Sequence, residues 1–149
     1  MAASGHKVEK VTPKDIDEIY ALWEAARLPA RTKGRDTREH IARELAESTS
    51  VFLKAVLVAD GTIVGVAFGT HDGRKGWINR LAVHPKYQKS GIAAELVKAC
   101  EQGLRDKGIH MFAALIDEGN EGSMEFFKKM GYNRRDDIVY FSRRDYEDI

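Results

Sequence analysis

The chain has 149 residues, of which 43% are hydrophobic, and its 24 Lys and Arg nearly balance its 23 Asp and Glu, for a formal net charge of +1. This length and composition predict one compact domain over residues 1–149. The near-neutral charge supplies no overall attraction to nucleic acid or to an anionic membrane, so neither is an expected partner. The longest apolar runs, such as Ala55–Ala59, are far shorter than the roughly 20 residues of a membrane span.

The cysteine content and the first residues bear on where the protein works. The single Cys100 cannot form an internal disulfide, which favours a cytoplasmic location. Met1–Lys7 has neither the apolar stretch nor the cleavage pattern of a signal peptide. We expect it to be a short disordered lead.

The first part of the chain predicts one edge strand followed by two amphipathic helices. Lys7–Val11 has the length of a short strand, and Thr12–Asp15 combines an N-cap residue, a proline and an acidic residue in the order that opens a helix. Apolar residues then recur every three or four positions up to Pro29. Asp36 with Glu39 forms a capping-box signal for the second helix.

Three antiparallel strands are expected next. Val51–Ala59 and Thr62–Thr70 are rich in Val, Ile and Phe, and Asp60-Gly61 between them is a strong hairpin signal. A polar turn with glycine at both ends then leads into Trp77–Val83, which stops before Pro85.

The remainder alternates helix and strand. Gly91–Lys107 carries apolar residues at four-residue spacing and predicts the main helix. Met111–Ile116 reads as a strand, Glu121–Met130 as a short helix and Ile138–Phe141 as a last strand. This order predicts a mixed α/β fold rather than regular βαβ alternation.

The segment Arg80–Ala93 is the most informative for function, because it is a strand, a loop and a helix start in succession. The first N–H groups of a helix have no internal partner and carry partial positive charge, so an anion bound there is stabilised. Gly91 and Ala93 permit close approach of a ligand to the backbone. On this spacing alone, a plain loop with Gly91 in the turn and Ser90 as N-cap is an equal alternative.

The wider pattern resembles motif A of the GNAT superfamily of acyl-CoA-dependent N-acetyltransferases. That motif is an apolar strand ending in Leu-x-Val, a proline, and Arg/Gln-x-x-Gly-x-Gly/Ala at a helix start, and Gln88–Ala93 matches every defined position. Asn120 and Phe126–Tyr132 resemble the second coenzyme-contacting motif of the same family. The resemblance implies a single-domain GNAT-type fold, with a mixed, mostly antiparallel sheet flanked by helices.

The resemblance also implies an activity and a set of coenzyme-binding residues. The protein is expected to transfer an acetyl group from acetyl-CoA to a primary amine by direct attack, without metal or covalent adduct. By analogy with the family, it could form a homodimer. Lys86 and Lys89 are placed to meet coenzyme phosphates or are simply solvated. The residues implied to contact the coenzyme are Leu81, Ala82, Val83, Gln88, Lys89, Ser90, Gly91, Ile92, Ala93, Asn120 and Phe127.

The general base is harder to assign. The strand approaching the thioester carries Trp77 and Asn79 where some relatives of the family have a glutamate. His71 and Asp72 are the catalytic candidates, because they combine titratable chemistry with a position near the sheet's open end. Ordinary turn chemistry also explains Asp72 followed by glycine. Glu24 on the first helix is a weaker candidate.

The general acid is equally open. Phe126-Phe127 stands where many relatives have a tyrosine, and Tyr132 or Tyr140 could take its place unless both only pack. Backbone N–H groups of the strand Leu81–Val83 could polarise the thioester carbonyl without any special side chain.

The acceptor side is expected at the loop Arg27–Arg35, which is conspicuously basic. This composition indicates either an acidic or phosphate-bearing acceptor or a solvated loop. Two rival functions remain on the sequence alone. One is a non-catalytic module that binds acyl-CoA, consistent with the absent tyrosine and strand carboxylate. The other is a nucleic-acid-binding domain using the basic patch of residues 27–38, which the near-zero net charge disfavours.

Overall fold

Five strands form one sheet in the order β1-β2-β3-β4-β5 in the computed structural model, which describes residues 5–149. Neighbouring strands among the first four run antiparallel, and β5 runs parallel to β4. This arrangement confirms the predicted mixed, mostly antiparallel sheet. The strands are β1 (His6–Lys10), β2 (Ser50–Leu57), β3 (Ile63–His71), β4 (Gly76–Val83) and β5 (Phe112–Ala113).

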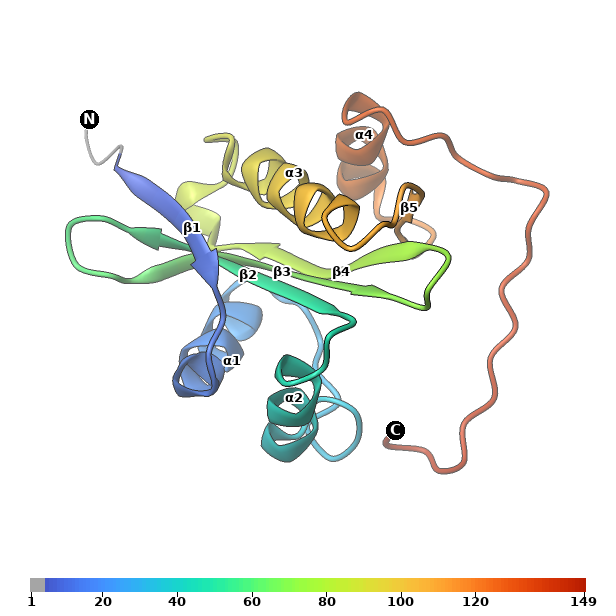
Figure 1. Ribbon diagram of the computed structural model, residues 1–149, viewed down its shortest axis with the longest axis horizontal. Coiled ribbons are helices and arrows are strands. Elements are labelled where there is room, and N and C mark those ends of the chain that lie inside the picture. Colours follow the sequence, from blue (N-terminus) through green and yellow to red (C-terminus); the bar gives the residue numbers. More distant parts are fainter. Residues whose placement is uncertain (1–4) are drawn as a thin grey trace.

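Helices cover both faces of this sheet. Figure 1 shows α3 and α4 on one side and α1 and α2 on the other. The strand β3 is buried along most of its length, because a sheet covered on both faces needs apolar residues at successive positions. The helices are α1 (Ile16–Ala25), α2 (Arg38–Leu45), α3 (Ile92–Arg105) and α4 (Glu121–Lys129), with 3-10 turns at Pro13–Asp15 and Pro85–Tyr87.

The sheet separates two apolar cores. On the α1 and α2 side, Trp23 and Ile41 pack with Phe52 and Phe68, whose rings stack with centroids 3.9 Å apart. On the α3 and α4 side, the core contains Leu96 and neighbouring residues of α3 together with Phe127 of α4. The apolar spacing in the sequence therefore predicted the buried faces of α1 and α3.

The start of α2 differs from the prediction. Thr37, not Asp36, is the N-cap, and its side chain accepts a hydrogen bond from His40 N. Asp36 is buried instead, and its carboxylate accepts a hydrogen bond of 2.6 Å from Arg31 N. The capping signal was displaced by one residue because Asp36 is used to close the preceding loop.

Three other boundaries were wrong. His6 and Lys7 lie in β1 rather than in a disordered lead, whose residues 1–4 lie outside the described range. The predicted strand Met111–Ile116 is reduced to the two residues of β5. The expected strand Ile138–Phe141 does not form, and its side chains are 60 to 88% exposed. High β propensity reports how well a residue fits a partner strand, and β5 offers too short an edge.

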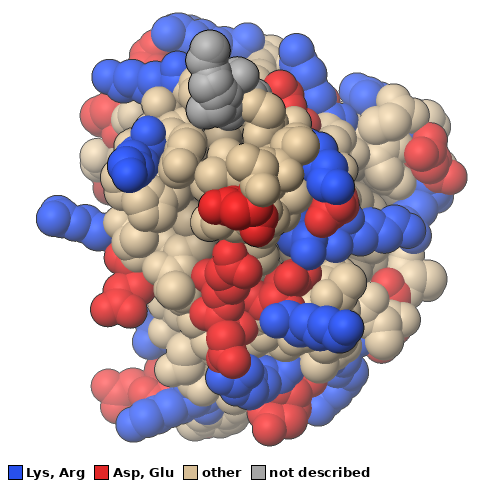
Figure 2. Space-filling view, turned by 90° about the vertical axis from the view of Figure 1, so that its left-hand side faces the viewer, with Lys and Arg blue, Asp and Glu red and all other residues tan. Residues whose placement is uncertain are grey.

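The surface carries charges of both signs. Figure 2 shows the side with β1 and the β2–β3 turn, where basic and acidic side chains are interspersed and acidic ones gather near the middle. In the described part of the chain, this face has no continuous basic surface of the kind that follows a phosphate backbone. No helix between residues 5 and 149 has the length and apolar character to cross a membrane.

Candidate functional site

Strand β4 contains a bulge at the segment that the sequence singled out. Val66 pairs with Ala82 and Phe68 pairs with Asn79, so two residue steps on β3 face three steps on β4. Arg80, inside this interval, has φ +53°, a left-handed conformation that costs a non-glycine residue about 1 kcal/mol or more. Bulges redirect backbone groups out of the ladder. Immediately before Leu81, the strand therefore has backbone N–H and C=O groups that lie outside the regular sheet pairing.

Beyond Trp77, β4 has no partner strand on its β5 side within residues 5–149. The two strands pair at Gly76 with Phe112 and at Trp77 with Ala113 only, and then separate. Extending the same register would bring Leu81 opposite Asp117, across the opening. The strand edge that leads to Leu81–Val83 is thus available to a ligand, as the predicted acetyl-pantetheine site requires.

The loop between β4 and α3 is held by its own hydrogen bonds. The Gln88 side chain donates to Val83 O at 3.0 Å, which ties the loop back to the strand. Tyr87 N donates to His84 O at 2.8 Å, and Ser90 Oγ donates to Tyr87 O. Ser90 therefore stabilises the loop. The alternative interpretation of the sequence, in which Ser90 is the N-cap of α3, is wrong.

The N-cap of α3 is Gly91, with φ +88°. Lys89 also has positive φ, at +62°, whereas Ser90 between them does not. Alternation of this kind makes successive N–H groups converge into a concave nest that binds anions. The first backbone bond of the helix joins Glu95 N to Gly91 O at 3.1 Å, so the N–H groups of residues 92–94 have no intrahelical partner.

These features fit the diphosphate of coenzyme A. A Cβ placed on Gly91 would meet no atom within 4 Å, so the space above the nest is open to a ligand. Lys86 and Lys89 flank the nest and are exposed. The nest, the helix dipole and the unpaired edge of β4 follow one another along 14 residues of chain, from Arg80 to Ala93.

The second predicted motif is placed around α4. Asn120 is the N-cap of α4 and accepts a hydrogen bond from Ser123 N at 3.2 Å. Phe127 is buried and packs edge-to-face on Tyr132, with ring centroids 5.0 Å apart. Tyr132 donates its hydroxyl to Glu101 at 2.7 Å, and burial raises the pKa of this phenol. The structure thus gives all three residues packing or capping contacts, and their coenzyme contacts stay predictions.

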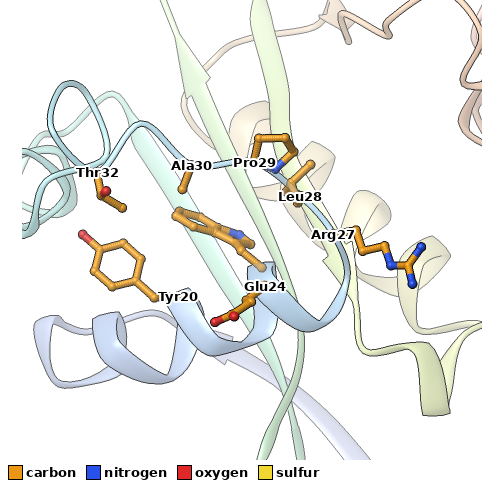
Figure 3. Close-up of a pocket in the computed structure, with 8 residues that line it drawn as sticks. Tyr20, Glu24, Arg27, Leu28, Pro29, Ala30 and Thr32 are labelled. Atoms are coloured by element: carbon orange, nitrogen blue, oxygen red, sulfur yellow. The ribbon is translucent and has the colours of Figure 1, made fainter. Parts of the chain in front are cut away.

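A first cleft of about 530 Å³ lies between α1 and the loop that follows it. In Figure 3, Tyr20 and Glu24 of α1 face the loop residues Ala30 and Thr32 across this cleft, whereas Arg27 points away. Trp23 also lines it.

Arg80 lies behind this first cleft and connects it to β4. Its guanidinium stacks on the Trp23 ring at 4.0 Å from the centroid and donates to Pro29 O at 2.5 Å. The bulged strand and the predicted acceptor loop are therefore joined by one side chain.

A second cleft of about 440 Å³ opens between the acceptor loop, the segment after β5 and the C-terminal segment. It is lined by Arg35, Leu115, Ile116, Asp117, Tyr140, Ser142, Arg143, Arg144 and Ile149. Leu115–Asp117 line this cleft and follow shortly after β5 in the chain, so one side of the second cleft is formed by the segment that leaves β4.

Comparison with known proteins settles the family. The model of the acetyltransferase (GNAT) family matches residues 16–132. The chain belongs to this family. An acetyltransferase from Photorhabdus laumondii is 32% identical over 131 residues, which cover 87% of this chain and 89% of the relative. An acetyltransferase from Yersinia pseudotuberculosis is 31% identical over 129 residues, with the same two coverages.

Solved GNAT structures agree with this fold. The PaiA N-acetyltransferase of Thermoplasma acidophilum, in complex with coenzyme A, aligns with a TM-score of 0.77 at 19% identity, covering 89% of this chain and 92% of that one. An aminoglycoside acetyltransferase from a soil metagenomic sample aligns with a TM-score of 0.76 at 21% identity, covering 93% and 95%. The predictions of a GNAT fold and of an acetyl-CoA-dependent N-acetyltransferase are confirmed.

The two catalytic candidates from the sequence lie far from the GNAT coenzyme segment. His71 pairs with Gly76 at the opposite end of β4, five residues or about 16 Å along the strand from Leu81. Asp72 accepts hydrogen bonds from Arg74 N and Lys75 N at 2.9 and 2.8 Å, and these bonds lower its pKa. The geometry gives Asp72 a turn-forming role, so a catalytic role for either residue stays a prediction.

Sequence reasoning did not single out Asp117, Arg143 or Arg144 for the site, and it did not single out the side chain of Arg80. Asp117, Arg143 and Arg144 share one cleft because the segment after β5 and the C-terminal segment meet there, whereas Arg80 contacts Pro29 beside the first cleft. The sequence contained one usable signal for these residues, because Asp117 directly follows the predicted strand Met111–Ile116. Among residues 5–149, no group of three or more His, Cys, Asp and Glu side chains could hold a metal ion.

Proposed function

We propose that this GNAT acetyltransferase holds acetyl-CoA along the free edge of β4 and the N-terminus of α3, and takes its primary amine from the second cleft. The observation that carries the proposal is the continuity of three features. The bulge, the two-residue β4–β5 pairing and the nest at Lys89–Gly91 lie in sequence along one ligand path.

The backbone supplies the main catalytic interaction in this proposal. N–H groups freed around the bulge at Arg80 would donate to the thioester carbonyl in the opening and stabilise negative charge as it develops on that oxygen. The N–H groups at residues 92–94 and the nest neutralise the diphosphate. No side chain needs to change its protonation state for either interaction.

Asp117 is the proposed proton acceptor. A lysine-like amine has a pKa near 10.4, so reaching its neutral form costs roughly 4 to 5 kcal/mol at neutral pH, and a nearby base recovers part of this cost. Extending the β4–β5 register beyond its two pairs would bring Asp117 opposite Leu81, and Asp117 lines the second cleft. Glu24 lines the first cleft, on the other side of the acceptor loop.

The leaving thiolate needs less help than the amine. A thiol with a pKa near 8.5 leaves as thiolate at neutral pH at a cost of about 2 kcal/mol. Tyr132 is bound to Glu101 and its pKa is raised, which leaves it poorly placed as an acid. Tyr140 lines the second cleft, so it is the tyrosine that a leaving group could reach.

The test of the coenzyme site is isothermal titration with acetyl-CoA, using Gly91→Glu and the matched control Gly108→Glu. Both glycines have positive φ, +88° and +85°, with open space around them, but Gly108 lies beyond the far end of α3. We expect micromolar binding by the wild type and by Gly108→Glu, and a loss of about 100-fold or more in Gly91→Glu, because a carboxylate there repels phosphate. Equal loss in both variants would contradict the assignment.

The test of the base is steady-state turnover of the Asp117→Asn variant. We expect kcat to fall about 100-fold with unchanged affinity for acetyl-CoA. Glu118→Gln, next in the chain and outside the cleft, serves as the control. A larger loss in Glu24→Gln than in Asp117→Asn would transfer the role to the first cleft.

Three further expectations stay predictions, since the fold bears on none of them. These are the single domain over 1–149, the cytoplasmic location and the homodimer. Sedimentation of the full chain with and without acetyl-CoA would decide the oligomeric state.

A further inference from the structure

The second cleft is built from three separate parts of the chain that are held together closely. Gly34 in the acceptor loop lies directly against the C-terminal segment, and a Cβ at that position would approach Asp148 O to 2.3 Å. Leu115 and Ile116 form the apolar side of the cleft, and Tyr140 adds an aromatic ring. A volume of about 440 Å³ falls in the range typical of small-molecule sites.

The charges of this cleft are unbalanced. Its lining contains three exposed arginines, Arg35, Arg143 and Arg144, against one acidic side chain, Asp117. Within residues 5–149, neither Arg35 nor Arg143 forms an ion pair, whereas the neighbouring Arg134 and Arg135 both do. Arg144 donates to the backbone oxygen of Ile149. Two guanidinium groups therefore line the cleft without a charged partner from the protein.

A second place with unpaired donors lies behind the first cleft, outside the lining of the second cleft. Three buried side-chain N–H groups in the described part of the chain have no acceptor from the protein, and all three meet where Arg80 stacks on Trp23. They are Trp23 Nε1 and the Nε and Nη2 atoms of Arg80. Burial lowers the pKa of Arg80, and the nearby charge of Arg35 lowers it further while Asp36 opposes both. This part of the acceptor side is rich in donors and poor in acceptors.

We propose that the acceptor of this enzyme carries an anionic group, a carboxylate or a phosphate, close to its amine, and that Arg35 and Arg143 bind this group in the second cleft. The proposal rests on the proposed function, because it places the acceptor in the cleft that contains Asp117. Arginine forms paired hydrogen bonds with either anion, and such charge-assisted bonds are the strong ones in proteins.

The arrangement also explains how one cleft could orient a small zwitterion. Asp117 attracts the ammonium end, and the two arginines attract the anionic end, so the amine is directed toward β4. A polycation would be repelled by the same arginines. Some solved proteins of this fold are aminoglycoside acetyltransferases, and their polycationic substrates are the opposite of the class inferred for this chain.

The first experiment compares matched amines in a thiol-release assay with acetyl-CoA. One arm pairs each free amino acid with its carboxamide, and the other pairs O-phosphoethanolamine with ethanolamine, which distinguishes a carboxylate from a phosphate. We expect the anionic member of at least one pair to have a kcat/KM about 10-fold or more above its neutral partner, expressed mainly in KM. Preferred acetylation of neutral amines or of the polycation sisomicin would overturn the proposal.

The second experiment removes the two arginines. The double variant Arg35→Gln/Arg143→Gln should bring the ratio within each pair close to 1, because it removes the charged donors and leaves Asp117 in place. Arg74→Gln together with Arg43→Gln changes the net charge equally at exposed positions away from the cleft, and should retain the wild-type ratio. If both double variants retain the ratio, or both lose it, the two arginines are not the recognition site.

A binding measurement decides the case in which no amine of the panel is turned over. Protein saturated with coenzyme A is titrated with inorganic phosphate and with succinate. Binding that is weakened about 10-fold in the Arg35→Gln/Arg143→Gln variant alone supports the proposal, and no heat from either anion contradicts it. Failure of the wild type to bind coenzyme A at all would instead contradict the proposed function, so the two failures are distinguishable.

Discussion

The coenzyme side and the acceptor side of this acetyltransferase are built in different ways. The coenzyme side is nearly continuous in sequence, and local backbone hydrogen bonds between β4 and α3 hold it. The acceptor side is assembled from the acceptor loop, Arg80, the segment after β5 and the C-terminal segment. In the proposed function, backbone N–H groups recognise the constant ligand of the family, whereas side chains from remote segments recognise the amine. One fold can thus keep the same acyl donor while the amine acceptor differs between proteins.

The largest expected effect concerns the two cores beneath these sides. Leu96→Ala and Ile41→Ala each remove a fully buried side chain, one on the α3 face and one on the α2 face. Each should lower the free energy of unfolding by roughly 2 to 5 kcal/mol in urea denaturation. In folded protein at low temperature, Leu96→Ala should weaken acetyl-CoA binding, whereas Ile41→Ala should mainly raise KM for the amine. The same kinetic change in both would mean that the two sides are not separable.

The next largest effect concerns the side chain that joins the two sides. Arg80→Met removes the hydrogen bond to Pro29 O and the guanidinium that lies over the Trp23 ring, while it keeps an unbranched side chain. We expect kcat/KM for the amine to fall about 10- to 30-fold, with the acetyl-CoA dissociation constant within about two-fold of wild type. Arg74→Met, in the exposed turn before β4, is the matched control. Weaker acetyl-CoA binding in Arg80→Met would show that the bulge itself depends on this side chain.

A smaller effect is expected within the coenzyme loop. Gln88→Ala removes the bond to Val83 O, which contributes about 1 kcal/mol, so acetyl-CoA binding should weaken about five-fold in calorimetry. The Michaelis constant for the amine should not change. Gln102→Ala, which removes an exposed contact with Asp106, is the control. An effect of Gln88→Ala on the amine alone would reverse the assignment of the two sides.

Outside the neutral pH range, a dependence of stability on pH is expected from Cys100, inside the core below α3. Burial raises the pKa of this thiol from 9.0 to about 12, so the folded state retains the proton that the unfolded chain loses. The contribution is fully present below pH 9 and is lost between pH 9 and about 12, by roughly 1 kcal/mol per pH unit. Urea denaturation of wild type and Cys100→Ala across this window should show a steeper decline for the wild type. Parallel declines would contradict the burial of an un-ionised thiol.

Local signals predicted elements well where the chain supplied its own partners. The hairpin at Asp60-Gly61 and the left-handed Gly108 after α3 both depend on a few adjacent residues, and both occur as expected. The apolar run Ile138–Phe141 failed as a strand because a strand also needs a free edge to pair with. The sequence also does not show that His71 pairs with Gly76, at the end of β4 opposite to Leu81–Val83, and the catalytic role of His71 and Asp72 stays a prediction.

The amino-acid sequence by itself determined the family and most helices and strands, and it predicted a coenzyme segment, because these follow from spacing over a few residues and from backbone groups that every residue carries. Only the tertiary structure decided the acceptor side. Asp117, Arg35 and Arg143 are separated by many residues and share no periodic pattern, and they line one cleft because the acceptor loop, the segment after β5 and the C-terminal segment meet in the fold. The position of a charged side chain in the fold depends on how distant segments pack together, and no local sequence pattern records that packing.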